Sequence, residues 1–262
     1  MKKLLNILCI TIALVLSVPL FSGCSPKESP VEDFEYKVHN DSTVSITKYI
    51  GTDKDVVIPS KIEGMPVLRI FTFAFNCSEI ESVYIPDTVT HISMYAFSHS
   101  KQLHTVHLGK SVEIIECEAF RGCTSLKTIN FPDSLNEIRF LAFAECKSLA
   151  EITIPKSVVL MEHQAFSATG LTSITFEDGI KTIGSSLCFW NTNVIDSITI
   201  PASVTEIGEY SFNDSLKAAY FSGNAPEKVG NFPFDKKTNI YYKKGTTGWD
   251  AEVWKDYNLI EQ

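Results

Sequence analysis

LKTINFPDSLNEIRFLAFAECKSL, residues 126–149, is a unit that the rest of the chain repeats. It contains the apolar alternation Ile129-x-Phe131, which stops at Pro132 because proline has no N–H for strand pairing. A second apolar pair follows, and then Phe143. The same frame places phenylalanine at Phe75, Phe97, Phe120, Phe143, Phe166, Phe189 and Phe212. Their first spacing is 22 residues and each later spacing is 23.

This fixed period predicts the fold. A period of roughly 20–29 residues indicates a leucine-rich-repeat solenoid, in which units stack because one unit alone cannot bury its apolar edges. We therefore expect a β-rich solenoid of about seven 23-residue units, with these phenylalanines as its structural core. An N-terminal β-hairpin cap and an irregular C-terminal cap are expected at the ends, because terminal repeats meet water on one face.

Each unit is predicted to contain one half-buried strand, because apolar and polar residues alternate in it. The inward pairs are Val83/Ile85, Val106/Leu108, Ile129/Phe131, Ile152/Ile154, Ile174/Phe176 and Ile198/Ile200. The residue between the members of a pair points away from the core. These outward positions, which we call the outward column, are Tyr84, His107, Asn130, Thr153, Thr175, Thr199 and Tyr220.

The outward column is the candidate binding face. Solenoids use such extended faces to bind partners, and exposed tyrosine is favoured at recognition sites. The alternative is a plain solvated sheet, because threonine also favours strands for packing reasons alone.

The repeat frame resembles the BspA-type leucine-rich repeat, whose units combine an I-x-I-P strand, a V-T-x-I-G turn and an A-F-x-x-C step. The best local matches are IPASVTEIG at residues 200–208 and AFRGC at residues 119–123. The resemblance covers roughly residues 50–245. Gly109, Glu177 and Ser222 replace the proline, and Cys188 and Ser211 replace the alanine. What the resemblance implies is a bacterial cell-surface protein that adheres to host or partner proteins and to other cells.

The composition limits the partners. A chain of 262 residues that is 44% hydrophobic can bury a sizeable core. The formal charge is −8, and removal of Lys2 and Lys3 with a leader leaves 31 acidic against 21 basic residues, or −10. This acidic excess disfavours nucleic acid as a partner.

The first residues are typical of an exported lipoprotein. Lys2 and Lys3 precede an apolar run to Phe21, as in a signal peptide. Residues 20–24, LFSGC, resemble a bacterial lipobox, which implies lipidation of Cys24. We therefore expect a protein on the cell surface, anchored by lipid to the outer face of a bacterial membrane. The alternative is ordinary secretion with Cys24 left in the tail.

The chain divides into five predicted segments. They are a signal peptide (1–23), a lipidated N-terminus and linker (24–33), an N-terminal cap (34–55), the solenoid (56–222) and a C-terminal cap (223–262). The linker is polar and contains two prolines. The C-terminal segment contains Trp249 and Trp254, which either close the core or form a platform for a sugar.

No residue pattern predicts catalysis, a cofactor or a metal. Nucleophile elbow, P-loop, dinucleotide-binding and H-E-x-x-H motifs are absent from the sequence. The clustered histidines are His91, His99, His104 and His107, which we interpret as solvated. Cys123 and Cys146 occupy equivalent positions of adjacent units, and we interpret them as buried thiols because a parallel stack holds their β-carbons too far apart for a relaxed disulfide.

The sequence thus predicts a non-enzymatic binding and adhesion module for an extracellular protein, tethered by a lipid anchor. Two alternatives stay open. One is a structural component of the envelope, and the other is a carbohydrate-binding accessory lipoprotein whose partner is a glycan.

Overall fold

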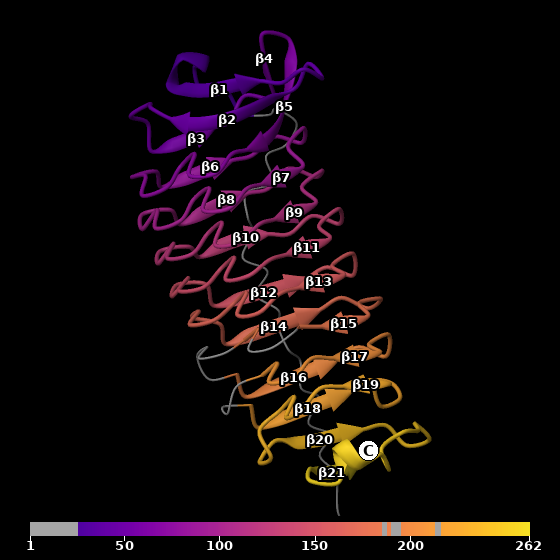
Figure 1. Cartoon of the computed structure of the whole chain (residues 1–262). Coiled ribbons are helices and arrows are strands. Elements are labelled where there is room, and N and C mark those ends of the chain that lie inside the picture. Colours follow the sequence, from indigo (N-terminus) through magenta and orange to yellow (C-terminus); the bar gives the residue numbers. More distant parts are fainter. Residues whose placement is uncertain (1–25, 185–187, 190–194, 213–215) are drawn as a thin grey trace, which may run out of the picture.

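The described part of the chain is an elongated β-solenoid of about nine turns, which confirms the predicted fold (Figure 1). The computed structural model describes residues 26–184, 188–189, 195–212 and 216–262. The predicted signal peptide and Cys24 lie outside the described residues. In the described part, no helix is long or apolar enough to cross a membrane.

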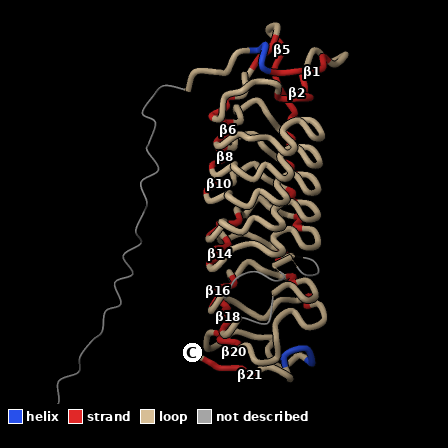
Figure 2. Tube along the Cα trace, turned by 90° about the vertical axis from the view of Figure 1, so that its left-hand side faces the viewer, coloured by secondary structure: helices blue, strands red, loops and turns tan. Residues whose placement is uncertain are grey.

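Each turn contributes one strand to a first column, which lies along one side of the stack (Figure 2). The strands of this column are β3 (Asp55–Val57), β6 (Ser82–Tyr84), β8 (Thr105–His107), β10 (Thr128–Asn130), β12 (Glu151–Ile154), β14 (Ser173–Phe176), β16 (Ser197–Ile200), β18 (Ala218–Phe221), β20 (Asn239–Tyr242) and β21 (Asn258–Glu261). Paired neighbours in it are parallel and in register. The column is where the sequence predicted the half-buried strands.

The second apolar pair of each unit forms a second column of shorter strands. They are β5 (Met65–Ile70), β7 (His91–Ile92), β9 (Ile114–Ile115), β11 (Glu137–Ile138), β13 (Leu160–Met161), β15 (Thr182–Ile183), β17 (Glu206–Ile207) and β19 (Lys228–Val229). The strand β4 (Lys61–Ile62) pairs antiparallel with β5 at the first turn. The predicted N-terminal hairpin consists of β1 (Phe34–Val38) and β2 (Val44–Tyr49), and β2 covers the edge of β5.

Residues at both ends are more closely joined to the stack than their composition suggests. Ser29, in the predicted linker, donates its backbone N–H to the Val57 carbonyl at 2.9 Å, and a one-turn 3-10 helix follows at Val31–Asp33. The residues assigned to a C-terminal cap include β19, β20 and β21, which continue both columns. A second 3-10 helix, Glu252–Trp254, precedes β21.

The core is a column of stacked aromatic rings. Neighbouring centroids lie 4.8–5.5 Å apart with interplanar angles of 2–16°. The rings are Tyr49, Phe75, Phe97, Phe120, Phe143, Phe166, Phe189, Phe212 and Phe234. Tyr49 and Phe234 extend the column beyond the seven periodic phenylalanines, which is why the solenoid has more turns than the strict period indicates.

Backbone hydrogen bonds join the turns beside these rings. The N–H of each ring residue donates to the residue before the next ring, as when Phe143 N–H donates to the Ala165 carbonyl at 2.8 Å. Alanine fits this position because its small side chain lets successive turns approach closely; Ala142 and Ala165 are fully buried.

Candidate functional site

The structure places the outward column on one face of the solenoid. Strand register aligns Tyr84 with His107, and His107 with Asn130. Thr153 aligns with Thr175, and Thr199 with Tyr220. The residues from Asn130 to Tyr220 are exposed, whereas Tyr84 and His107 are half-buried. The face is therefore a row of hydroxyl and amide groups with an aromatic side chain at each end.

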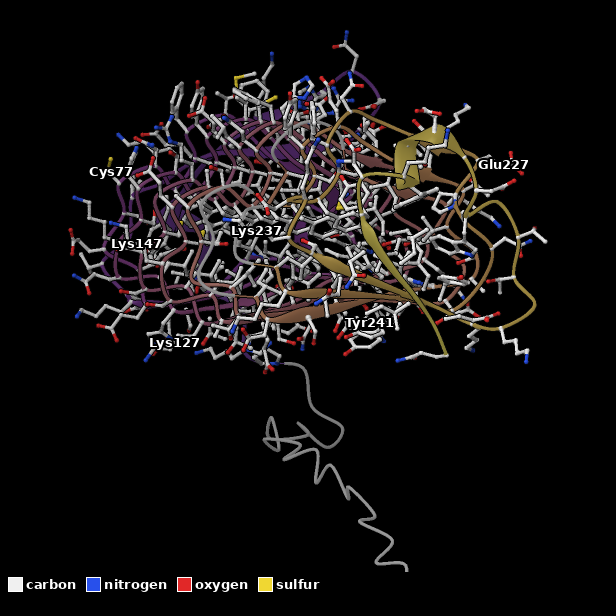
Figure 3. All side chains as sticks on the ribbon, turned by 90° about the horizontal axis from the view of Figure 1, so that it is seen from below. Cys77, Lys127, Lys147, Glu227, Lys237 and Tyr241 are labelled. Atoms are coloured by element: carbon white, nitrogen blue, oxygen red, sulfur yellow. The ribbon has the colours of Figure 1, made fainter. Side chains whose placement is uncertain are left out.

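The aromatic groups at the two ends are arranged differently. Tyr84 lies 6.0 Å from His107 with the rings tilted. Tyr220 stacks on Tyr241, with centroids 4.7 Å apart and an interplanar angle of 16°. Sequence reasoning missed Tyr241, although the alternation Ile240-x-Tyr242 was a signal for it. Seen along the stack, Tyr241 projects from the edge of the molecule on the same side as Lys127 (Figure 3).

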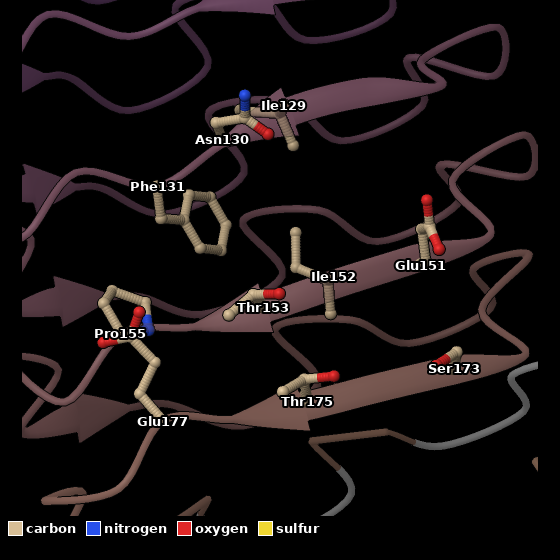
Figure 4. Close-up of a pocket in the computed structure, with 10 residues that line it drawn as sticks. All are labelled: Ile129, Asn130, Phe131, Glu151, Ile152, Thr153, Pro155, Ser173, Thr175 and Glu177. Carbon is tan, nitrogen blue, oxygen red and sulfur yellow. The ribbon is translucent and has the colours of Figure 1, made fainter. Parts of the chain in front are cut away.

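The first-strand column is interrupted next to the middle of this face. Among the described strands, β10 is the last member of one sheet and β12 the first member of the next. A groove of about 220 Å³ lies at this interruption (Figure 4). Its lining includes three outward-column residues, Asn130, Thr153 and Thr175, together with Phe131 and two glutamates.

A second set of exposed aromatic residues lies on the turns that follow the second strands. Phe73 is 55% exposed and stacks on Tyr95 at 5.0 Å, and Phe232 is 50% exposed and lies 5.7 Å from Tyr210. The backbone of all four is left-handed, with φ of 48–62°. This conformation is uncommon for large side chains. Each of the four lies two residues before a ring of the core column. This fixed position was a signal in the sequence that we missed.

A depression of about 340 Å³ lies beside the N-terminal hairpin. Its lining includes His39, Asp41, Arg69, Phe71 and His91. Burial lowers the pKa of His91, and the nearby Arg69 charge lowers it further. The imidazole therefore favours the neutral form, which suits its 2.8 Å hydrogen bond to the Thr90 hydroxyl.

The other titratable groups do not converge. In the part of the chain that the structure describes, no three His, Cys, Asp or Glu side chains are placed to hold a metal ion. Cys123 and Cys146 are buried free thiols, as interpreted from the sequence, and they donate to the carbonyls of Phe97 and Phe120. Burial raises the pKa of the Cys123 thiol to about 12, so this group stays protonated at neutral pH.

The C-terminal tryptophans belong to the core. Trp254 is fully buried and Trp249 nearly so, and both lie edge-on to Phe221. The Trp249 indole N–H donates to the Thr246 hydroxyl at 2.9 Å. Rings buried in this way cannot form a sugar platform, so that alternative for the two tryptophans was wrong. They fill the core beside Phe221, and β21 follows them in the first column.

Comparison with known proteins identifies the class of protein. The BspA type leucine rich repeat family matches residues 68–193 and 141–244, with six copies. The chain therefore belongs to this family, as the resemblance predicted. Comparison with curated proteins gave no match.

Solved structures agree with this fold. The leucine-rich repeat protein of T. pallidum is 28% identical, with a TM-score of 0.60 over 78% of this chain and 86% of that chain. A leucine-rich repeat protein from Bacteroides ovatus is 21% identical, with a TM-score of 0.54 over 90% and 76%. The pneumococcal vaccine antigen PcpA is 20% identical, with a TM-score of 0.50 over 90% and 77%. The last two similarities concern the fold alone.

Proposed function

We propose that the protein is a lipid-anchored module of the bacterial cell surface that binds an extracellular protein through its outward column and catalyses no reaction. The observation that supports this most strongly is the register of that column within each of its three sheets. Side chains about 4.8 Å apart along a rigid stack present a pre-organised surface, so little ordering entropy is lost on binding. Tyr84 and Tyr220 supply the amphipathic contact area that protein interfaces favour.

Two double variants test where the partner binds. Tyr84→Ala with Tyr220→Ala removes one aromatic group from each end of the outward column, and Phe73→Ala with Tyr210→Ala removes an equal number from the turns. In cross-linking pull-downs from intact cells, we expect the first variant to lose the captured protein by roughly tenfold or more. The second should capture as much as the parent chain. Loss of the captured protein in the second variant alone would indicate that the partner binds at the turns that bear Phe73 and Tyr210.

A different outcome would favour the structural alternative. If both double variants fold and neither changes what is captured, the protein is an envelope component without an external partner on these faces. Thermal melting of both variants is the control. The four side chains are at least partly exposed, so their removal should leave the aromatic core intact.

The anchor has its own test. Stable membrane attachment needs more than one acyl chain. The proposal places these chains on Cys24, the cysteine of the predicted lipobox. Cys24→Ser should abolish incorporation of labelled palmitate and move the protein from the membrane fraction to the supernatant. Cys77→Ser is the matched control and should change neither. Palmitate labelling that survives Cys24→Ser contradicts the anchor.

A further inference from the structure

The groove between β10 and β12 lies at one of two interruptions of the first-strand column among the described strands. The same two turns stay joined on the other sides of the solenoid, where β11 pairs with β13 and Phe143 donates to the Ala165 carbonyl. Only the first strands lack pairing here. The turns therefore open on one side, and the opening faces outward next to Asn130 and Thr153 (Figure 4).

Phe131 accounts for the apolar wall of this opening. Of the equivalent residues, Ile85, Ile154 and Ile200 are fully buried, whereas Phe131, like Leu108, is half-buried. Its ring lies 5.4 Å from Phe143 and is tilted by 52°, so it stands outside the parallel stack of core rings. Ile152 and Pro155 also line the groove but are buried, so Phe131 provides most of the apolar surface that water can reach.

Apart from the buried Ile129, the rest of the lining is polar and bears few charges. Asn130 offers an amide, and Thr153 and Thr175 offer hydroxyls. Glu151 and Glu177 stand at opposite ends. Glu151 aligns with Ser173, and Glu177 follows Ser173 by four residues. The two glutamates therefore lie roughly 13 Å apart along the strand direction, at 3.3 Å per residue. In the part of the chain described, neither glutamate is in an ion pair.

Charge does not favour an ionic ligand. No basic side chain lines the groove, so an anionic ligand would meet only the two carboxylates. A basic peptide is also disfavoured, because the exposed Lys127 immediately precedes β10 and the exposed Lys156 follows Pro155. These lysines offset the two glutamates at the rim.

We infer that the groove binds a neutral oligosaccharide, a ligand different from the protein partner proposed for the outward column. A pyranose ring has an apolar C–H face that can lie on the half-buried ring of Phe131. Its hydroxyls both donate and accept, and amide, hydroxyl and carboxylate groups complement them. The separation of Glu151 and Glu177 along the strands, roughly 13 Å, suits a short chain of sugars lying in that direction.

A matched pair of variants tests this inference. The probes are β-1,4-linked tetrasaccharides of glucose, mannose and N-acetylglucosamine, titrated into the full chain by calorimetry and by saturation-transfer NMR. Thr153→Arg fills the groove, and Thr199→Arg makes the same change in the same column outside it. We expect at least one tetrasaccharide to bind, Thr153→Arg to weaken it by roughly tenfold or more, and Thr199→Arg to leave it unchanged.

A third variant examines the aromatic wall. Phe131→Leu keeps an apolar side chain but removes the ring, and it should weaken binding several-fold while the melting temperature stays close to that of the parent. Tyr84→Ala with Tyr220→Ala should leave sugar binding intact, which distinguishes sugar binding in the groove from protein binding through the aromatic ends of the outward column.

Three results would overturn the inference. One is the absence of binding by every tetrasaccharide at about 10 mM. Another is equal binding by the parent and Thr153→Arg. The third is tighter binding by a tetralysine probe than by every tetrasaccharide, which would indicate a charged ligand such as a basic peptide.

Discussion

The buried ring column and the first-strand column run side by side but differ in continuity. The rings stack without interruption from Tyr49 to Phe234. Among the described strands, the first-strand column is interrupted between β10 and β12 and again between β14 and β16. Ring stacking and the backbone hydrogen bonds beside the rings therefore hold successive turns together where the first strands do not pair. The backbone can open on the outer side without disturbing the core, and such an opening is where a ligand groove can form.

The largest expected effect comes from interrupting the ring column. Phe143 is fully buried between Phe120 and Phe166, at 5.2 and 5.3 Å. Phe143→Ala should lower the free energy of unfolding by about 3–5 kcal/mol, because it removes buried area and leaves a cavity in the middle of the stack. Urea unfolding followed by circular dichroism measures this change.

The matched control for Phe143→Ala lies on the outer face. Thr199 is exposed on β16, so Thr199→Ala should change the stability by less than about 0.5 kcal/mol. If Phe143→Ala unfolds at the same urea concentration as the parent, continuity of the rings does not hold the solenoid together.

The thiols beside the rings provide a second test, with a pH dependence. Burial raises the pKa of Cys123 and Cys188 to about 12, and that of Cys146 well above its ordinary value. In the unfolded chain these thiols ionise near pH 8.5. The folded state keeps the proton, so this stabilising contribution is complete below about pH 8.5 and is lost as the pH rises toward 12.

Alkylation by iodoacetamide, mapped by mass spectrometry, measures this protection. At about pH 8 the exposed Cys77 should react quickly, and Cys146, in the turn beside the groove, should react only after unfolding. Cys77 serves as the internal control. Rapid alkylation of Cys146 in the native protein would mean that the opening between β10 and β12 reaches the ring column.

The smallest expected effect comes from closing the groove. Phe131→Ile introduces the side chain that equivalent positions bear at Ile85, Ile154 and Ile200. We expect β10 and β12 to pair, which should slow amide hydrogen exchange at Ile152 and Thr153. The stability should change by less than about 1.5 kcal/mol, because the substitution exchanges one apolar residue for another. Unchanged exchange at these amides would show that Phe131 does not cause the interruption.

The sequence predicted the parts of this protein that repeat. The period of the phenylalanines, the alternation around Val83 and the hairpin before residue 50 each have a local signal, and the structure confirms them. The exposed aromatic residues Phe73 and Phe232 were missed because their exposure depends on the left-handed backbone conformation of the turns in which they lie. The place of Trp254 was left open because the sequence does not show whether a terminal ring faces the core or water.

The sequence by itself determined the stacked fold, since a unit with two apolar edges is stable only against copies of itself. It also determined which side chains share the outward column, because strand alternation fixes the face of every residue. Only the tertiary structure decided that the column of strands opens between β10 and β12. The opening depends on how the Phe131 ring packs against Phe143 in its own turn and Phe166 in the next turn. The spacing of the repeats carries no information about this packing between turns.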